Sequence, residues 1–302
     1  MAIRTLVAGL SERAVVGEPG RQIVGLAYHS REVQPGFLFA AIRGYQHDGH
    51  EFVGEAVARG AVAVLVERSV DTAPAITQII VPDTRAALAH LACAFYEHPS
   101  HHLTVIGVTG TNGKGVTTYF TDAILMRAGY RSAVIGTMGV RAPAGTIETN
   151  RTTPESVDLQ RLLAGLRADG VTHVAMEVAS HALALHRVDG TRFAAAVFTN
   201  LTRDHLDFHG NFDAYLRAKR RLFEMVEPAG WSVVNADDAA AEEMARASRA
   251  PVLRYAMRAA GGGIDPHRVD LRAEEVQLGL DGTTFTAVTR RGERHRVRLR
   301  IG

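Results

Sequence analysis

Short apolar runs alternate with stretches of helical periodicity through the first hundred residues. An apolar run rich in β-branched residues predicts a strand, and apolar residues three or four positions apart predict a helix. Asp83 stands where a helix would begin, and its carboxylate can accept hydrogen bonds from the first free amides. The pattern predicts a small α/β domain with strands at 23–27, 37–42, 61–66 and 76–81, and helices at 51–59 and 83–97.

From residue 103 the same alternation contains a glycine-rich loop. The apolar run 103–109 predicts a buried strand, and 116–128 has helical spacing. Between them lies Gly110-Thr111-Asn112-Gly113-Lys114. The glycines allow the backbone to turn tightly and approach a ligand, the amides at the helix start attract an anion, and the lysine adds a positive charge. The order of strand, loop and helix therefore predicts a phosphate-binding site.

The loop departs from the general phosphate-loop pattern at both ends. Val108 stands where that pattern has its first glycine, and Gly115 stands where it has Ser or Thr. A tight turn without a ligand remains the alternative. Asn112 and Lys114 favour the phosphate site, because a simple turn needs neither.

The chain after this loop predicts a doubly wound parallel sheet followed by a β-rich segment. Strands at 132–135, 171–178, 193–198 and 232–235 alternate with helices at 154–168, 211–225 and 237–247. Strands at 269–278, 283–289 and 294–301 follow, with Asp281-Gly282 as a hairpin turn. Pro99 interrupts the polar tract before the glycine-rich strand, so we place the domain boundary there, with domains at 1–100 and 101–302.

Composition fits two globular domains in a reducing compartment. The 302 residues are 46% hydrophobic, and 34 basic against 32 acidic residues leave a net charge of +2, which gives no reason to expect a nucleic-acid partner. The single cysteine, Cys93, lies in an apolar helical run and is expected to be a buried core residue. No run has the length of a membrane span and the N-terminus does not resemble a signal peptide, so we expect a cytoplasmic protein without a membrane partner. We also expect a monomer.

Two further polar residues follow predicted strands. Glu177 and His205 come at the same edge of the predicted sheet as Lys114. A carboxylate and an imidazole near phosphates can hold Mg²⁺, although a loop-capping carboxylate and a structural histidine remain the alternative. The histidines of the loop at 44–50, with His29, match no standard zinc spacing, so a solvated ligand-binding loop is favoured there.

A set of short motifs runs along the whole chain. The motifs are Ser30-Arg31, Pro35-Gly36, Leu38-Phe39, Asp48-Gly49-His50, Gly110 to Lys114, Thr152-Thr153-Pro154, Met176-Glu177-Val178, Ser180-His181, His186-Arg187, Thr199-Asn200-Leu201, Arg203 to Asp207, His209-Gly210, Ala218-Lys219 and Asn235 to Asp238. Together they resemble the Mur ligase family, and within it the MurE type. The folylpolyglutamate synthases share the ligase core but not the first domain, and they are the second choice.

The resemblance implies an ATP-dependent ligase of peptidoglycan precursor synthesis. Such an enzyme phosphorylates a carboxylate of UDP-N-acetylmuramoyl-L-alanyl-D-glutamate, and the amine of a free amino acid, diaminopimelate or lysine, attacks the acyl phosphate to give an amide. Catalysis of this kind is mostly positioning and charge neutralisation. The implied cofactors are ATP and Mg²⁺, and the implied architecture is a UDP-precursor-binding domain at 1–100 followed by the ATP-binding ligase domain.

The resemblance also assigns roles to single residues. Lys114, His205 and Lys219 would be catalytic, and Glu177, His205 and a carbamylated Lys219 would hold the metal. A plain surface lysine is the alternative for Lys219. The ATP phosphates would contact Gly110, Thr111, Asn112, Gly113, Lys114, Gly115 and Val116. The UDP-linked substrate would contact Ser30, Tyr45, Gln46, His47, Thr152, Thr153, Ser180 and Arg187.

Several positions depart from the family pattern. Gly115 stands where MurE-type enzymes have a Thr that ligates Mg²⁺, and the other departures are Val116, His29, Arg151, Ala179 and Leu185. Family members have a C-terminal domain that binds the amino acid, so we expect this chain to be part of a longer protein, truncated before that domain. A truncated pseudoenzyme that binds the UDP-linked peptide without catalysis is the alternative.

Overall fold

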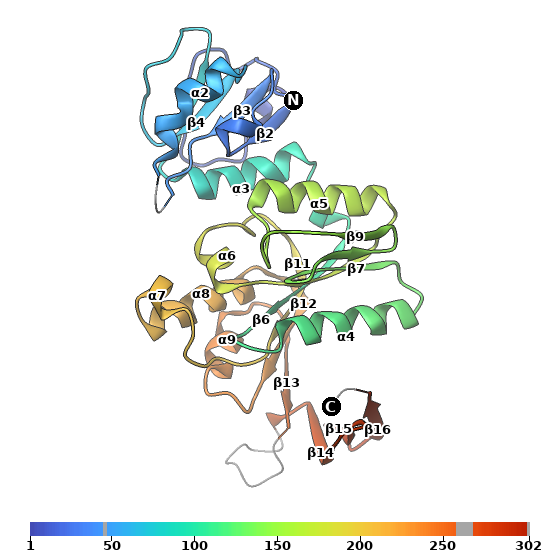
Figure 1. Cartoon of the computed structure of the whole chain (residues 1–302). Coiled ribbons are helices and arrows are strands. Elements are labelled where there is room, and N and C mark those ends of the chain that lie inside the picture. Colours follow the sequence, from blue (N-terminus) through green and yellow to red (C-terminus); the bar gives the residue numbers. More distant parts are fainter. Residues whose placement is uncertain (45–46, 258–267, 301–302) are drawn as a thin grey trace. The chain divides into compact units, whose positions relative to one another are not determined.

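The computed structural model describes residues 1–44, 47–257 and 268–300, which form two compact units. The first unit comprises Met1–Leu103, Thr153–Gly170 and Ala182–Thr191, and the second comprises Thr104–Thr152, Val171–His181 and Arg192–Gly302. The chain thus first passes between units close to the expected boundary, and two later segments return to the first unit. The assignment of ligands to 1–100 and 101–302 stays a prediction. Figure 1 shows both units and labels most of their elements.

The first unit is built on a five-stranded sheet in the order β1-β5-β4-β3-β2. The strands are β1 (Ala14–Val16), β2 (Gly25–Ala27), β3 (Phe37–Ala40), β4 (Ala63–Val66) and β5 (Thr77–Ile80). Strands β2 to β5 pair in parallel and β1 pairs antiparallel with β5. The four parallel strands are those that the apolar runs predicted. Strand β1 was not predicted, because its short segment is largely exposed and has no apolar alternation to mark it.

Helices and short turns complete the first unit. They are α1 (Ile3–Leu6), α2 (Val53–Ala58), α3 (Thr84–Phe95) and α5 (Ser156–Ala168), with 3-10 turns at Ser30–Glu32, Gly49–Phe52 and Pro99–His101. Asp83 caps α3 as expected, because its carboxylate accepts from the amides of Arg85 and Ala86. The predicted helix at 51–59 begins two residues later, since 49–52 form a 3-10 turn.

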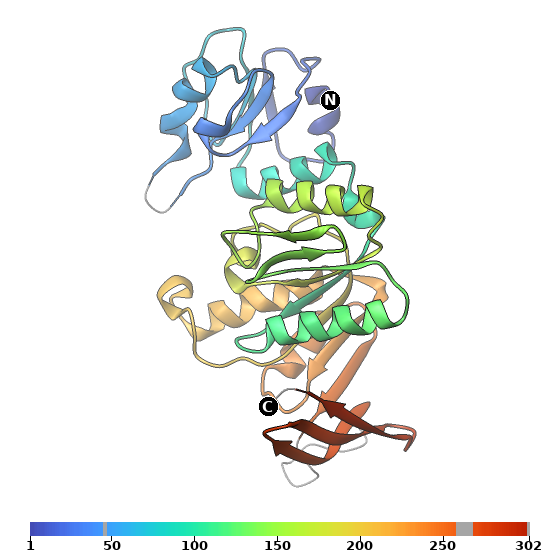
Figure 2. The ribbon, with the colours of Figure 1, turned by 45° about the vertical axis from the view of Figure 1, so that its right-hand side comes forward.

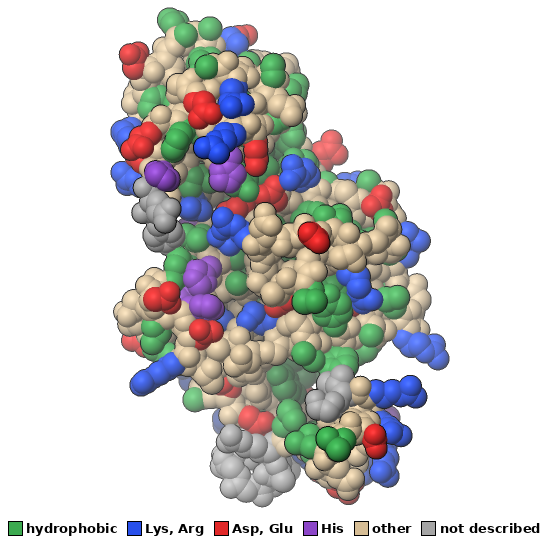
Figure 3. Space-filling model, viewed as in Figure 1, with side chains coloured by type: hydrophobic (Ala, Val, Ile, Leu, Met, Phe, Trp, Pro, Cys, Tyr) green, Lys and Arg blue, Asp and Glu red, His purple; other side chains and the backbone are tan. Residues whose placement is uncertain are grey.

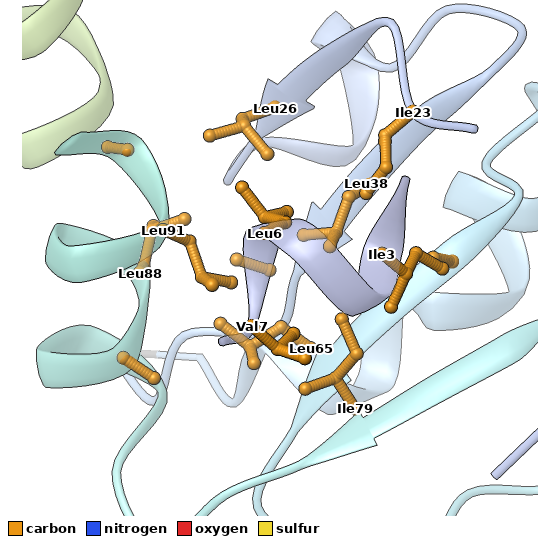
Figure 4. Packing of buried hydrophobic residues seen from close by; sticks show 14 of the residues in the cluster. Ile3, Leu6, Val7, Ile23, Leu26, Leu38, Leu65, Ile79, Leu88 and Leu91 are labelled. Atoms are coloured by element: carbon orange, nitrogen blue, oxygen red, sulfur yellow. The ribbon is translucent and has the colours of Figure 1, made fainter. Parts of the chain in front are cut away.

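The core of the first unit joins α1 and α3 to one face of this sheet. Ile3 and Leu6 from α1 point towards Leu38 and Leu65 from β3 and β4, and Leu91 of α3 closes the cluster (Figure 4). All five side chains are at most 2% exposed. Cys93, on the same helix, is buried as expected, and burial raises the pKa of its thiol to about 12.

The second unit contains an eleven-stranded sheet in the order β16-β15-β14-β13-β12-β11-β6-β10-β7-β8-β9. The strands from β13 to β7 in this spatial order form the centre of the sheet. Each of them pairs in parallel with its neighbours within this group, as the doubly wound pattern predicted. They are β6 (Thr104–Thr109), β7 (Ser132–Gly136), β10 (His173–Glu177), β11 (Phe193–Phe198), β12 (Val226–Asn235) and β13 (Val252–Ala256).

Both edges of this sheet are antiparallel. Strands β8 (Gly139–Ala142) and β9 (Gly145–Ile147) extend it beyond β7. At the other edge β14 (Leu271–Gly279) pairs in parallel with β13, and β15 (Gly282–Thr289) and β16 (Arg294–Leu299) follow it in antiparallel pairing. The β14–β15 hairpin was predicted, but its two turn residues are Leu280 and Asp281, one position earlier than expected, and Gly282 begins β15. Residue 301, the end of the predicted last strand, lies outside the described residues.

The helices of the second unit pack on its parallel strands. Helix α4 (Lys114–Arg127) contacts β6, β7 and β10, α8 (Phe212–Glu224) contacts β6 and β12, and α9 (Ala241–Ala247) contacts α8 and β12 (Figure 2). Two short helices, α6 (Ser180–Ala184) and α7 (Leu206–His209), were not predicted. Helix α9 begins four residues later than predicted, because the Asp238 carboxylate accepts from the amide of Ala240 and forms a turn there.

Within the described residues, no helix combines the length and the apolar character that crossing a membrane requires.

Candidate functional site

The predicted phosphate loop follows β6 and leads directly into α4. Gly110 has a φ of +151° and Gly113 a φ of +83°, values that side-chain-bearing residues rarely adopt. A Cβ at Gly110 would overlap the side-chain oxygen of Thr199. Glycine is therefore required at the point where the loop passes β11, and Gly113 forms the N-cap of α4.

Polar groups that follow β11 hold this loop in place. Asn200 receives the amide of Asn112 on its Oδ1 atom at 3.0 Å and donates its Nδ2 to the Asn112 carbonyl at 3.1 Å. Thr199 Oγ1 donates to the same carbonyl at 2.6 Å. The Thr199-Asn200 segment thus fixes the loop conformation.

Lys114 lies at the first position of α4 and bends back over the loop. Its Nζ donates to the carbonyl oxygens of Gly110 at 3.0 Å and of Thr111 at 2.9 Å. Burial lowers the pKa of this amine, and the carboxylates of Glu177 and Asp204 oppose that shift. The amine therefore lies where a phosphate bound to the loop would meet it.

Lys219 on α8 reaches the same carbonyl from the other side. Its side chain is 1% exposed and its Nζ donates to Gly110 O at 2.7 Å, which excludes the alternative of a plain surface lysine. Burial, and secondarily the charge of Lys114, lower its pKa from 10.5 to about 7. A substantial fraction of this amine is therefore neutral at neutral pH.

Tyr215 connects Lys219 to the loop and was missed in the sequence. Its hydroxyl lies 3.1 Å from Thr111 Oγ1, and Lys219 Nζ lies 4.5 Å from the centroid of its ring. The ring of His205 lies 6.4 Å from the same ring, centroid to centroid. The spacing of four residues between Tyr215 and Lys219 was the available signal, because it places both on one face of a helix.

Glu177 ends β10 in a tight backbone enclosure. The amide of Thr137 donates to Glu177 Oε1 at 2.8 Å, and a Cβ on Gly136 would overlap that oxygen. A Cβ on Gly115 would lie 3.4 Å from the same oxygen. The carboxylate, 4% exposed as a residue, therefore faces the start of α4. Thr137 had no sequence signal of its own, since it follows a predicted strand like many other residues.

His205 has a more open environment. It adopts a left-handed φ of +52°, its side chain is 48% exposed, and its Nε2 lies 3.4 Å from Asp204 Oδ2. Its ring lies 4.7 Å from that of His181.

His209 lies near the same histidines. Burial, followed by the nearby charges of His181, Lys219 and His205, lowers the pKa of His209 to about 4.

The described residues contain no group of three or more His, Cys, Asp and Glu side chains placed to hold a metal by themselves. Glu177 nevertheless supplies the carboxylate oxygens that Mg²⁺ prefers, beside a loop suited to phosphates, which would complete the coordination. The expected ligand set of Glu177, His205 and Lys219 stays a prediction.

A largely apolar recess of about 740 Å³ adjoins the loop and Glu177. It begins at the phosphate loop and continues along the first turns of α4, so a ligand that reaches the loop can enter it. Its lining residues are Gly113, Gly115, Val116, Tyr119, Phe120, Ala123, Thr137, Met138, Arg141 and Glu177.

Two expected substrate residues also lie in the second unit. Thr152 Oγ1 lies 3.1 Å from Thr137 Oγ1. Thr137 itself contacts Glu177, so it is the residue that connects Thr152 with this carboxylate. Ser180 Oγ lies 3.0 Å from Nε2 of His209. Both hydroxyls are thus part of hydrogen-bond networks around the site.

The remaining expected substrate residues lie in the first unit. Arg187 is 8% exposed, and its guanidinium lies 3.0 Å from Glu155 Oε1 and donates to the Thr153 carbonyl at 3.4 Å. Ser30 Oγ donates to Glu55 Oε2 at 2.8 Å, and the exposed His47 packs edge-on against Phe52. The predictions for Tyr45 and Gln46 fall outside the described residues.

His50 differs from the solvated histidine expected in the loop at 44–50. It is 7% exposed, its Nδ1 lies 2.6 Å from Asp48 Oδ1, and its Nε2 accepts from the amide of Glu67 at 2.9 Å. Both ring nitrogens are therefore used within the fold, and His50 is a structural residue.

Family models match most of the chain. Residues 108–301 match the Mur ligase middle domain, and residues 22–96 match the model described as Mur ligase family, catalytic domain.

Curated relatives extend over nearly the whole chain. The chain is 42% identical to a UDP-N-acetylmuramoyl-L-alanyl-D-glutamate--2,6-diaminopimelate ligase of Syntrophomonas wolfei, over 94% of this chain and 57% of the relative. A solved structure of a ligase of the same name is 27% identical, with a TM-score of 0.83, and the match covers all of this chain and 60% of that one. A structure of MurF from Acinetobacter baumannii is 25% identical, with a TM-score of 0.61, over 93% of this chain and 56% of that one. The chain thus spans somewhat more than half the length of the proteins that it matches.

Proposed function

Because the chain belongs to the Mur ligase family, we propose that it carries the acceptor-binding and ATP-binding parts of a ligase that extends UDP-N-acetylmuramoyl-L-alanyl-D-glutamate. The ligase would add the third amino acid of the peptidoglycan precursor in the cytoplasm. The curated relative and the similar solved structure are named for 2,6-diaminopimelate, which favours that amino acid over lysine.

The observation that carries this proposal is the meeting of two lysine amines on one loop carbonyl. Lys114 and Lys219 both donate to Gly110 O, at the start of a helix whose free amides attract anions. Lys114 and the helix N-terminus supply positive charge for the phosphates that are transferred and released, and Lys219 lies at the same point.

The proposed reaction is the one that the family resemblance implies. The acceptor carboxylate attacks the γ-phosphorus of ATP, the bond to the β,γ-bridging oxygen breaks, and ADP leaves. The amine of the incoming amino acid then attacks the acyl carbon and inorganic phosphate leaves. Lys114 and the amides of the loop would stabilise the charge on the transferred phosphoryl group throughout.

Lys219 has the environment that carbamylation requires. A neutral amine attacks CO₂ and releases a proton, and burial keeps a substantial fraction of this amine neutral near pH 7. The carbamate would carry a negative charge and two oxygens close to the loop. Together with Glu177 and His205 it would hold Mg²⁺, which supplies charge neutralisation when bound.

The recess next to Glu177 is continuous with the start of α4 and supports a position for the acceptor there. The carboxylate end of an acceptor in this recess would face a phosphate held by the loop. Thr152 and Ser180 in the second unit, and Ser30, His47, Thr153 and Arg187 in the first, are proposed to contact other parts of the acceptor.

Trapping the acyl phosphate tests the proposal. The chain is incubated with Mg²⁺, ATP, UDP-N-acetylmuramoyl-L-alanyl-D-glutamate and hydroxylamine, and the hydroxamate of the acceptor is measured. We expect hydroxamate and ADP only when the acceptor is present, and Lys114→Ala should abolish both. Arg220→Ala, a change at an exposed ion pair on α8, is the matched control and should leave both unchanged.

A second candidate is a non-catalytic protein that binds the UDP-linked peptide, and Gly115 favours it because this position lacks a hydroxyl beside Glu177. Acceptor binding by calorimetry without any hydroxamate would support that candidate. A folylpolyglutamate-type ligase would instead form hydroxamate from a folate and none from the muramoyl acceptor.

A further inference from the structure

The recess beside the phosphate loop has one cation, Arg141, among the described residues that line it. The other charged residue of the lining is Glu177, and the remainder is largely apolar. Figure 3 shows hydrophobic and basic side chains together over the region of α4. A carboxylate that enters an apolar space without a partner loses its hydration and is strongly disfavoured. Arg141 is therefore the group with which a second negative charge on a bound ligand would pair.

Two side chains of α4 hold Arg141, which is part of β8. Its Nη2 donates to Oδ2 of Asp122, and its guanidinium carbon lies 5.2 Å from the centroid of the Tyr119 ring. Asp122 and Tyr119 are three residues apart and therefore lie on the same side of the helix. The face of an aromatic ring attracts a cation. The guanidinium is thus held by an ion pair and by a ring at the wall of the recess.

The carboxylate of Asp122 keeps this arginine in place. Asp122 is 1% exposed, and its Oδ1 accepts from Ser132 Oγ at 2.6 Å. If Arg141 moved away, the carboxylate would remain buried without a cation, which is strongly destabilising. The guanidinium is therefore in position before a ligand arrives, and binding does not have to order it.

Part of the guanidinium is still available to a ligand. The side chain of Arg141 is 41% exposed, and its Nε has no hydrogen-bond partner among the described residues. An arginine presents five N–H donors in a planar fork, which matches the two oxygens of a carboxylate. A buried donor without a partner is costly, so a ligand oxygen that accepts from it is favoured.

Arg141 also lies near the reacting end of the recess. Because β8 pairs antiparallel with β7, Arg141 is opposite Val134 and Gly139 is opposite Gly136. Gly136 is the residue whose Cβ would overlap the carboxylate of Glu177. The two residues of strand between these pairs correspond to about 7 Å. Two groups of one ligand can therefore reach Arg141 and the site of reaction together.

We propose that Arg141 binds the carboxylate of the acceptor that is not phosphorylated, and thereby selects acceptors whose peptide ends in a dicarboxylic residue. The inference rests on the proposed function, which supplies the acceptor. The D-glutamyl end of UDP-N-acetylmuramoyl-L-alanyl-D-glutamate has two carboxylates. One receives the phosphoryl group, and the other keeps its charge in the recess and pairs with Arg141. Asp122 acts through Arg141 and is a positioning residue.

Titration calorimetry with two acceptor analogues tests the inference. Each analogue has one of the two D-glutamyl carboxylates converted to an amide. We expect the parent chain to bind one of these monoamides roughly 10- to 100-fold more weakly than the diacid, because a charge-assisted hydrogen bond is lost. Arg141→Gln should bind this monoamide and the diacid with the same reduced affinity. This monoamide should still form hydroxamate, since its reacting carboxylate is intact.

Further variants separate ligand binding from folding. Arg141→Gln leaves the buried carboxylate of Asp122 without a cation, so Arg141→Gln combined with Asp122→Asn, which removes both charges, is measured beside it and should give the same affinities. Asp122→Asn alone should reduce the difference between the diacid and the monoamide, which a merely structural role would not change. Arg246→Gln, at an exposed ion pair on α9, should bind every ligand as the parent chain does.

Three results would overturn the inference. The first is equal affinity of the parent chain and Arg141→Gln for the diacid. The second is a loss of affinity for Mg²⁺ and ADP in Arg141→Gln, which would assign this arginine to the nucleotide. The third is hydroxamate formation only from the monoamide whose binding still depends on Arg141. If the parent chain does not bind the diacid at all, the proposed function fails too, whereas binding that does not depend on Arg141 contradicts this inference alone.

Discussion

Only two of the 34 basic side chains are lysines, and both lie at the phosphate loop. Arginine keeps its charge under all ordinary conditions, whereas a buried lysine can lose its proton. All other basic side chains among the 34 are arginines. The two lysines are therefore found at the phosphate loop, where a compact cation that can lose its proton has a function. This count was available in the sequence, but only the structure shows that Lys219 lies at the loop.

The low pKa of Lys219 predicts a pH-dependent contribution to stability. Between its folded-state pKa of about 7 and the usual 10.5, the unfolded chain binds a proton that the folded chain does not, so lowering the pH favours unfolding. Below about pH 7 the amine is protonated in both the folded and the unfolded state, so the free-energy cost of burying its charge no longer changes with pH. Lys219→Met removes this cost.

We therefore expect the free energy of unfolding of Lys219→Met, relative to the parent chain, to rise by on the order of a few kcal/mol from pH 10 to pH 7. Urea unfolding in CO₂-free buffer measures it. A difference that does not vary with pH would show that the buried amine keeps an ordinary pKa.

Gly136 is predicted to be essential for the position of Glu177. A Cβ there would overlap the carboxylate oxygen, so Gly136→Ala should displace Glu177 and cost about 1–3 kcal/mol of stability. Gly165→Ala is the matched control, because nothing lies within 4 Å of its Cβ and the position is inside α5. That change should stabilise the protein by about 0.5–1 kcal/mol. Equal effects of the two substitutions in thermal unfolding would argue against the enclosure of Glu177.

At the residue scale, the sequence predicted which chemical groups would be present but not how they are held. The glycines, Lys114 and Glu177 follow from motif chemistry. The hydrogen bonds from Asn200 to the loop and from Thr137 to Glu177 join residues far apart in the chain, and periodicity carries no information about such contacts. The structural role of His50 was hidden for the same reason, since its partner Glu67 is distant in sequence.

At the scale of elements, α8 positions the site from outside the loop. It places Tyr215 and Lys219 on one face, and its start is fixed by Asn211, whose side chain accepts from the amide of Ala214 at 2.8 Å. This amphipathic helix, α3 and the parallel strands other than β13 were predicted with errors only at their ends. Strands β8, β9 and β13 were missed, because short edge strands and strands with mixed burial lack an apolar run.

Removing the N-cap of α8 should destabilise this helix, which positions Tyr215 and Lys219 in the site. Asn211→Ala removes the acceptor for a free amide and should cost about 1 kcal/mol in urea unfolding, whereas Asn211→Asp keeps an acceptor and should cost little. If Asn211→Asp destabilises the protein as much as Asn211→Ala, the side chain has another role.

At the scale of the whole molecule, the two units divide the expected tasks unequally. The second unit contains the loop, both lysines, Glu177 and the recess, so nucleotide binding and phosphoryl transfer are proposed for it alone. The first unit contains Ser30, His47 and Arg187, whose contact with the acceptor stays a prediction. The sequence predicted both folds, but the return of 153–170 and 182–191 to the first unit depends on long-range packing that local patterns do not encode.

The central claim is that Lys114 and the loop at 110–114 bind the phosphates of a nucleotide. Titration calorimetry of the chain with Mg²⁺ and ADP tests it most directly, with Lys114→Ala and Arg220→Ala as the paired variants. Loss of a charge-assisted hydrogen bond is worth about 1.5–3 kcal/mol, so we expect Lys114→Ala to weaken binding roughly 10- to 100-fold and Arg220→Ala to leave it unchanged. Equal affinity of the parent chain and Lys114→Ala would contradict the account.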